Sequence, residues 1–238
     1  MVGEEQAVLD HGFVRLDAVL ADDLSVVNSA RVSLAKRSDW EYSVGGNHRE
    51  LSKADKGLVK FLMTKRHGTP FEHNAFRFHV KAPLFVFREW QRHRIASYNE
   101  MSGRYVQFDN PDFYVPDEFR QRVEGSKPGA YAYETWKGNN KQAASLFARH
   151  NQDSLDLYEW AINNGMATEH ARIVLPVSLY SEMYWTTNAR SMMNFLSLRN
   201  EQQAMAEIRA YAEVVESIFA FYMPVTAEAF RANGRMAP

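Results

Sequence analysis

The chain has 238 residues, a formal net charge of -1, and 45% hydrophobic and 24% charged residues. These values are typical of a soluble globular protein, and the near-neutral charge argues against nucleic acid as a partner. Cysteine is absent, which excludes disulfides, thiolate metal ligands and a cysteine nucleophile. The acidic start MVGEEQAVLDHG has no signal-peptide core, and no run of 18 apolar residues occurs. We therefore expect a cytoplasmic protein without a membrane segment.

The N-terminal part predicts a strand followed by a helix. Residues 12–20 have the pattern of a strand, and an aspartate-capped turn leads into a helix that begins near Asp23. A polar insert follows at residues 35–52, where Gly45 and Gly46 indicate a mobile loop.

The next segment predicts a second helix and a second strand. Residues 53–68 have helical spacing and end in Lys, Arg, His and Gly, which is typical of a helix C-terminus. Thr69 and Glu72 fit a capping box around a first-turn proline. A ligand contact is the alternative for this pair. Residues 75–82 alternate apolar and polar side chains, as a half-buried strand does.

The middle of the chain predicts mostly helix. A proline opens the helix 83–94, which runs into a loop that contains glycine. From about 116 to 165 the pattern favours helix, with a loop at 124–129. A further helix at 168–175 is stopped by a proline, and residues 178–187 alternate as a strand does.

The C-terminal part predicts one long helix or two over residues 189–222, with Asn188 as the N-cap. Its apolar spacing indicates either a core-facing side or an oligomer face. Strands and helices do not alternate strictly, and no linker is evident. We therefore predict an α+β fold: a single domain over residues 1–238, with its core at about 12–230, and a mainly antiparallel sheet packed with helices, including a long C-terminal helix.

Several familiar sites are missing from the sequence. There is no phosphate-binding GxxxxGK[ST], no GxGxxG, no GxSxG and no HExxH. His67, His73 and His79 fall on different predicted elements, so we expect no metal site.

Two arginine-rich segments are candidates for binding an anion. The first, RHRIASYNEMSGRY, belongs to a stretch with four arginines between Arg88 and Arg104. Arginine binds phosphate through a planar fork, and Gly103 permits the backbone to approach a ligand closely. A solvated helix end followed by a polar loop is the alternative.

The second segment, NARSMMNFLSLR, repeats this chemistry about 90 residues later. On a helix, Arg190 and Asn194 share a face, whereas Arg199 points roughly the opposite way. The helix is otherwise apolar, so these arginines need partners, either carboxylates such as Glu182 or ligand phosphates. Two opposite faces suggest two ligands, or one ligand and a subunit interface.

The first segment resembles the signature of the flavin-dependent thymidylate synthases, in which RHR is followed by seven residues and a serine. Here these are Arg92, His93, Arg94 and Ser102. ARVS, TPFEH, FHVKAP, ARIVLP and WTTNARSMMNFLSLR also resemble blocks of that family, in the same order. The similarity extends over nearly the whole chain.

This resemblance implies reductive methylation of dUMP to dTMP, with methylenetetrahydrofolate as carbon donor and NADPH as reductant through bound FAD. It also implies a homotetramer whose active sites are shared between subunits. The absence of cysteine agrees with it, because the unrelated thymidylate synthases attack uracil with a thiolate.

The resemblance carries over to individual residues. The positions implied to contact FAD are Ser33, Thr69, Glu72, Arg92, His93, Arg94, Glu100, Asn188, Arg190 and Asn194. The positions implied to contact dUMP are Glu89, Trp90, Gln91, Arg92, Glu100, Met101, Ser102, Gly103, Arg104, Arg172 and Arg199. Arg199 resembles the catalytic residue that activates the pyrimidine, because a guanidinium beside the ring stabilises developing charge. Ser102 as a covalent nucleophile is disfavoured, since no general base adjoins it.

The chain departs from the family at three places. Gln203 stands where some relatives have histidine, Glu89 stands where close relatives have glutamine, and the insert at 40–49 matches no family block. Two other functions use the same arginines. A non-catalytic RNA- or nucleotide-binding protein would show steep salt dependence and no flavin. A helical oligomerisation protein would bind no ligand.

Overall fold

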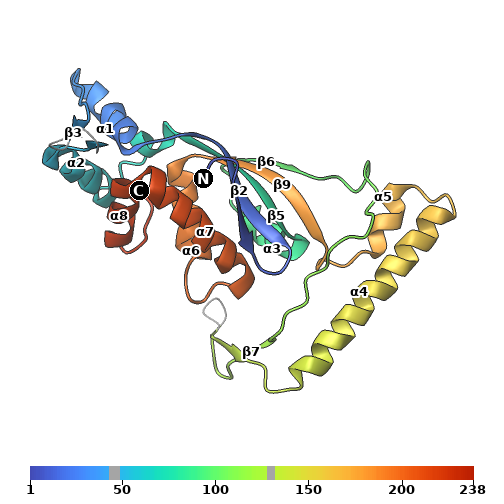
Figure 1. Ribbon diagram of the computed structural model, residues 1–238. Coiled ribbons are helices and arrows are strands. Elements are labelled where there is room, and N and C mark those ends of the chain that lie inside the picture. Colours follow the sequence, from blue (N-terminus) through green and yellow to red (C-terminus); the bar gives the residue numbers. More distant parts are fainter. Residues whose placement is uncertain (43–48, 128–131) are drawn as a thin grey trace.

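The centre of the computed structural model is a five-stranded antiparallel sheet (Figure 1). The structure describes residues 1–42, 49–127 and 132–238. The strands, in spatial order, are β1 (Glu5–Val8), β2 (Gly12–Leu20), β5 (Ala75–Pro83), β9 (Tyr180–Thr187) and β6 (Ser97–Glu100). The predicted strands at 12–20, 75–82 and 178–187 are therefore confirmed, as is the α+β fold class.

Apolar and polar side chains alternate along β5 and point to opposite faces of the sheet. Phe76, Phe78 and Val80 are fully buried, and the side chains between them lie on the more exposed face. Phe78 is opposite Trp185 of β9, and their rings stack with centroids 5.3 Å apart. The apolar face of the sheet thus becomes one side of the main core.

Six α-helices contribute to the core beside that face. They are α1 (Asp23–Arg31), α2 (Lys53–Thr64), α3 (Leu84–Trp90), α6 (Ala189–Arg199), α7 (Ala206–Tyr222) and α8 (Pro224–Ala232). Asp22 caps α1 by accepting a hydrogen bond from the Ser25 backbone N–H at 2.7 Å, which confirms the predicted helix start. Likewise, Asn188 caps α6 by accepting from the Ser191 N–H at 2.9 Å.

The predicted C-terminal helix is two helices, α6 and α7, and a third, α8, follows at the proline where the prediction ended. The apolar side of α7 faces the core, since Ile208, Tyr211, Val215, Ile218 and Phe219 are all 0% exposed. The alternative of an oligomer face is wrong for these side chains.

The middle of the chain differs from the prediction. Helix α4 (Asn140–Asn163) is confirmed, but 116–139 contains the short strands β7 (Arg120–Arg122) and β8 (Tyr133–Thr135), which pair with each other. Neither RQR nor YET carries an apolar alternation, so the pairing of the two strands with each other, and not a local pattern, makes these residues extended. The loop predicted at 124–129 lies partly outside the described residues.

The helix predicted at 168–175 is also shorter than expected. It consists of a single turn, α5 (Thr168–Ala171), and a 3₁₀ turn, η3 (Arg172–Val174). Figure 1 shows α4 set apart from the sheet, beside α5. These elements share a small second core, which contains Leu155, Tyr158 and Ala171.

Two further differences concern the predicted site. Thr69–Glu72 forms a 3₁₀ turn, η2, and no side-chain cap is made at its start, so the capping box is wrong. Helix α3 ends at Trp90, before Arg92 and Arg94, and the loop predicted after it contains the edge strand β6.

The polar insert contains two short paired strands, β3 (Glu41–Tyr42) and β4 (Arg49–Glu50). Gly45 and Gly46, where the sequence indicated a loop, lie outside the described residues. No helix in the described parts of the chain is long and apolar enough to cross a membrane.

Candidate active site

The RHR segment is a bend between α3 and β6. Helix α3 ends when Gln91 takes the C-cap position, and Tyr98 of β6 donates its hydroxyl hydrogen to the His93 carbonyl oxygen at 2.7 Å. This bond fastens the bend to the sheet. Arg92 and Arg94 are exposed on either side of the half-buried His93. The bend therefore presents two cations around one imidazole.

His93 and Arg199 bring the two arginine-rich segments together. Arg199 donates from Nε to His93 Nε2 at 3.1 Å and from Nη1 to Glu89 Oε2 at 2.9 Å. Burial, together with the Arg199 charge, lowers the pKa of His93 to about 4, so the imidazole is neutral at physiological pH. A neutral ring whose Nε2 accepts carries its proton on Nδ1.

A pocket of about 260 Å³ opens beside this bend, between the RHR segment, β9 and α6. The predicted residues that line it are Arg92, His93, Arg94 and Asn194. Neither Arg92 nor Arg94 forms an ion pair with a carboxylate of the described residues. Two unpaired guanidinium groups at a pocket are suited to an anionic ligand.

A second pocket, of about 500 Å³, lies at the C-terminal end of β6. Its lining includes Glu100, Met101, Gly103 and Arg172, together with Arg88. A Cβ added to Gly103 would lie 2.7 Å from the Phe108 ring and 3.3 Å from Arg172 Cδ, so glycine permits this close approach.

The predicted phosphate-binding segment follows directly. Ser102 is partly buried, and Arg104 is exposed with its Nε 3.8 Å from Glu169. Thr168 donates from Oγ1 to the Arg104 carbonyl oxygen at 2.6 Å, which ties the segment to α5. Gln91 donates to Glu100, the last residue of β6, at 2.9 Å, which links the RHR segment to this end of the strand.

Arg190 belongs to a third group of predicted residues, around η2. It pairs with Glu72, and its Nε donates to the Pro238 carbonyl oxygen at 2.8 Å. The Arg190 guanidinium also packs on Gly68, where an added Cβ would lie 2.5 Å from Nε. Thr69, next to this glycine, is exposed.

The carboxylate partners of the two α6 arginines are thus Glu72 and Glu89. Glu182, which the sequence suggested, is not the partner, because it lies 2.8 Å from His79 in the neighbouring strand. Residues on β9 and β5 are fixed opposite each other by the sheet register, which sequence distance alone does not reveal.

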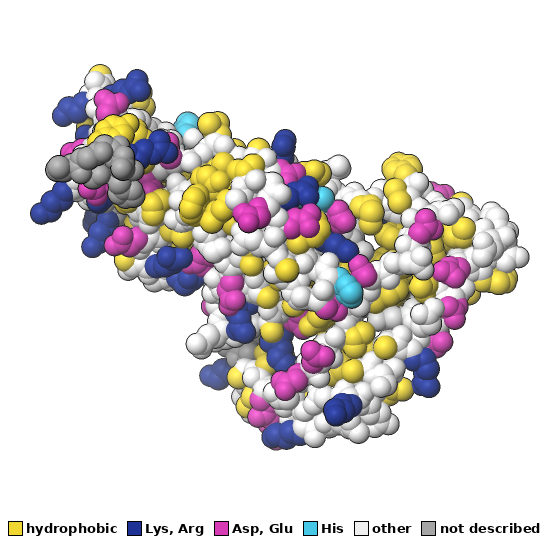
Figure 2. Space-filling view, viewed as in Figure 1, with side chains coloured by type: hydrophobic (Ala, Val, Ile, Leu, Met, Phe, Trp, Pro, Cys, Tyr) yellow, Lys and Arg dark blue, Asp and Glu magenta, His cyan; other side chains and the backbone are white. Residues whose placement is uncertain are grey.

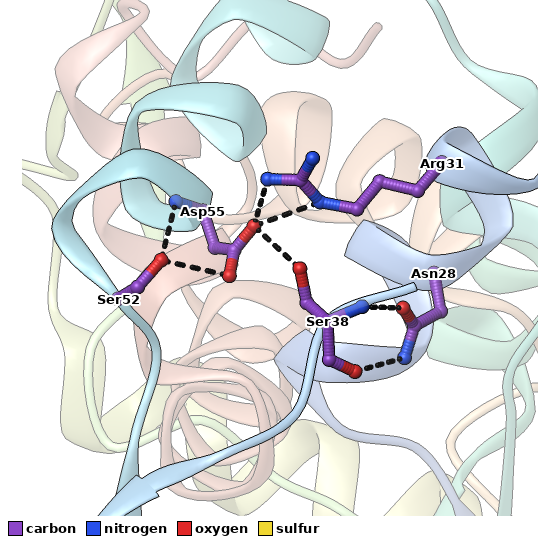
Figure 3. A network of polar contacts seen from close by, with 5 residues as sticks. All are labelled: Asn28, Arg31, Ser38, Ser52 and Asp55. Atoms are coloured by element: carbon purple, nitrogen blue, oxygen red, sulfur yellow. Dashed lines mark hydrogen bonds and ion pairs between the residues drawn. The ribbon is translucent and has the colours of Figure 1, made fainter. Parts of the chain in front are cut away.

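The segment that carries Ser33 is held by a polar network, drawn in Figure 3. The carboxylate of Asp55 accepts from Nε and Nη2 of Arg31, from Ser38 Oγ at 3.0 Å and from Ser52 Oγ at 2.8 Å. Asn28 exchanges two hydrogen bonds with the backbone of Ser38. The network joins α1, the start of the insert and α2.

Ser33 itself lies in the 3₁₀ turn η1 (Val32–Leu34), directly after Arg31, and is exposed. No contact joins it to the RHR segment within the described residues of this chain. The side chain of Asn188 is engaged in capping α6, and the Trp90 side chain is fully buried against Trp185 and Phe195. Any contact of Trp90 with a ligand would therefore involve its backbone.

Some site residues were missed by the sequence analysis. Ser191 and Thr187 line the smaller pocket, and Arg120 and Tyr133 line a third pocket of about 600 Å³, next to Arg199 and Gln203. Ser191 directly follows Arg190 in the second arginine-rich segment, so the sequence could have predicted it as a site residue. The β7–β8 residues have no such signal, because only the fold brings them to Arg199.

The charges outside these pockets do not favour a polyanion. On the face shown in Figure 2, basic and acidic side chains are interspersed. Among the described residues, no group of three or more His, Cys, Asp or Glu side chains is arranged to hold a metal ion.

Comparison with known proteins agrees with the sequence signature. The profile of the family described as thymidylate synthase complementing protein matches residues 16–225. A flavin-dependent thymidylate synthase of Thermosipho melanesiensis is 44% identical over 226 residues, which are 95% of this chain and 93% of the relative. A flavin-dependent thymidylate synthase of Tropheryma whipplei is 46% identical over 228 residues, which are 92% of this chain and 91% of the relative.

A solved structure has the same fold. The crystal structure of a UMP/dUMP methylase, PolB from Streptomyces cacaoi, bound with 5-Br UMP, is 39% identical. It superposes with a TM-score of 0.80 over 97% of this chain and 98% of that one. A second structure of PolB, bound with 5-Br dUMP, gives a TM-score of 0.82 at 36% identity. The chain belongs to the flavin-dependent thymidylate synthase family and is an enzyme of the methyltransferase class.

Proposed function

We propose that the protein catalyses reductive methylation of dUMP to dTMP, with methylenetetrahydrofolate as carbon donor and NADPH as reductant through bound FAD. Family membership supports methylation of the nucleotide, and the PolB structures were solved with brominated UMP and dUMP. The observation that carries the proposal is the location of Arg199. Its guanidinium contacts His93 of the first pocket and itself lines the third.

The residues around the RHR bend fit a flavin dinucleotide. Arg92 and Arg94 would pair with its diphosphate, and Asn194 and Arg190 would supply further hydrogen-bond donors. FAD, when bound, would supply the reducing chemistry. A pocket of about 260 Å³ is smaller than the ~300–1,000 Å³ of pockets that enclose a whole ligand. This supports a site completed by other subunits, as in the proposed homotetramer.

The segment after β6 fits the phosphate of dUMP. The backbone N–H groups at Ser102 and Gly103 and the Arg104 fork suit a dianion, and Arg172 lies beside them. The remaining proposed nucleotide contacts are at residues 89–92 and 100–101. The pocket there contains Arg88 and Arg172, neither of which is paired with a carboxylate of the described residues. The phosphate would thus be bound away from Arg199.

Arg199 would act on the uracil ring. A guanidinium beside the ring carbonyl stabilises the negative charge that develops as the ring carbon becomes nucleophilic. This route needs no thiolate, and the chain has no cysteine to provide one. Because the carbon donor and the reductant are cytoplasmic metabolites, we propose the cytoplasm as the place of the reaction.

The proposal is tested first by flavin binding. The purified protein is incubated with FAD, freed of unbound dye by gel filtration, and examined by absorbance. We expect a retained flavin band that NADPH bleaches without oxygen. Light scattering on the same sample measures the oligomeric state, for which we expect a tetramer. A folded protein that retains no flavin would refute the enzyme proposal and favour an oligonucleotide-binding role.

The second test is turnover of dUMP and of UMP. We expect dTMP formation that depends on methylenetetrahydrofolate and is abolished in Arg199→Ala, whose circular dichroism matches wild type. Arg37→Ala is the control, because the Arg37 side chain is 81% exposed and its contact with a carboxylate is a long one, 3.9 Å from Asp39. Wild-type turnover by Arg199→Ala would show that another group activates the ring. Preference for UMP would correct the proposed substrate.

A further inference from the structure

Arg199 is held on two sides by residues of the α3 segment. Its Nε donates to His93 at 3.1 Å and its Nη1 to Glu89 at 2.9 Å. Both carboxylate and guanidinium are more than half buried, with 32% and 20% of the side chains exposed. Within the described residues no hydrogen bond occupies Nη2, which leaves this N–H group for a ligand.

We propose that Glu89 is a positioning residue for the reaction: its ionised carboxylate orients the Arg199 guanidinium toward the uracil ring, and its protonation sets the acid side of the pH profile. The inference rests on the proposed function, because the ring is that of dUMP. An arginine side chain has several rotatable bonds, and two fixed contacts on one planar group determine the direction of the third edge. Removing one contact permits the guanidinium to rotate about the other.

The charged groups that face Glu89 come from three elements. They are Arg199 on α6, Glu207 on α7 and Arg120 on β7. Burial raises the pKa of Glu89 above its usual value; Arg199 and Arg120 oppose this, while Glu207 adds to it. Glu89 therefore takes up a proton at a higher pH than a solvent-exposed glutamate does.

His93 does not titrate in the same range. Its pKa is lowered to about 4, so it remains neutral and continues to accept from Arg199 while Glu89 is protonated. A protonated Glu89 loses the charge that strengthens its hydrogen bond with Nη1. The variant Glu89→Gln, which cannot titrate at this position, therefore identifies the part of the acid limb in kcat that belongs to Glu89.

The test compares kcat and the KM for dUMP of wild type, Glu89→Gln and Glu89→Ala, each saturated with FAD, between about pH 5 and 8. In the wild type, kcat should fall on acidification with one ionisation. Glu89→Gln retains an oxygen acceptor, so its kcat should be reduced less than that of Glu89→Ala. Because glutamine cannot titrate, the pH profile of kcat in this variant should lack the acid limb. Glu89→Ala should lose about 10- to 100-fold in kcat where wild-type Glu89 is ionised, as expected for a lost hydrogen bond to a charged group, and this loss should shrink on acidification.

The KM for dUMP should change by less than about threefold in both variants, because the proposed phosphate contacts lie elsewhere and a backbone contact at position 89 survives both substitutions. Glu213→Gln is the control: it removes a glutamate that pairs with Arg209 at 3.8 Å on α7, outside the site. Its pH profile should match wild type.

The outcomes separate this inference from the proposed function. An acid limb retained in Glu89→Gln, in an enzyme that otherwise turns over dUMP, overturns the positioning role alone. So does a loss in Glu89→Ala that appears in KM and thermal stability but not in kcat. A wild-type protein that binds FAD but does not methylate dUMP overturns the proposed function, and the inference with it.

Discussion

The Asp55 network offers a sharp test of how the Ser33 turn is held. The Asp55 side chain is 4% exposed and accepts from one guanidinium and two hydroxyl groups. Asp55→Ala removes the carboxylate and leaves Arg31, which is 23% exposed, without its counter-ion. Breaking a buried pair costs about 3–5 kcal/mol, and partial access to water favours the lower end, about 3 kcal/mol.

In a chain of this length, about 3 kcal/mol corresponds to a fall in Tm of roughly 6–12 °C. Differential scanning fluorimetry at pH 7 measures it. Asp39→Asn is the matched control, because Asp39 is 84% exposed and lies 3.9 Å from Arg37; its Tm should not change measurably. A Tm of Asp55→Ala within about 2 °C of wild type would refute the reasoning, since the network would then contribute no more than a surface pair.

The pH dependence of this pair has a definite sign. Burial alone would raise the pKa of Asp55, but the hydrogen bonds from Arg31, Ser52 and Ser38 together lower it below the usual 3.8. The carboxylate therefore stabilises the fold fully above pH 3.8, and this contribution is lost as the pH falls through the lower pKa of the folded state. The stability difference between wild type and Asp55→Asn should shrink only in that acid range. The retained flavin of each variant, measured well below its Tm, shows whether the turn matters for the cofactor.

Two glycines and a tyrosine give further predictions. Gly12→Ala should destabilise strongly, because its Cβ would lie 1.9 Å from Tyr211 Oη and 2.8 Å from the Lys81 carbonyl oxygen; the Tm and the yield of folded protein measure this. Tyr211→Phe should cost about 1–2 kcal/mol, because Tyr211 donates to that carbonyl at 2.9 Å; an unchanged Tm would contradict it. Gly103→Ala should weaken dUMP binding in calorimetry with little change in Tm, because its Cβ would lie 2.7 Å from the Phe108 ring and displace the proposed phosphate segment. Wild-type affinity would refute this use of Gly103.

Local patterns predicted many elements of the fold. The alternation of apolar and polar residues at 75–82 and 178–187 was sufficient to predict β5 and β9, and the cap at Asn188 was sufficient to predict the start of α6. Side-chain period and capping act within a few residues, so a local pattern reveals them. Prediction failed where local preference is weak. Strand β6 is four residues long and has no apolar alternation, and its pairing with β9 comes from the sheet.

The site divides in the same way. The sequence by itself determined that the chain carries two arginine-rich segments, lacks cysteine and bears a family signature, since these depend only on residue identity and order. Only the tertiary structure decided which charges meet. Glu89, His93 and Arg199 are neighbours across 106 to 110 residues of chain because α3 and α6 pack on one core. Partial burial beside that core lowers the pKa of His93 and raises that of Glu89, and no sequence pattern carries this information.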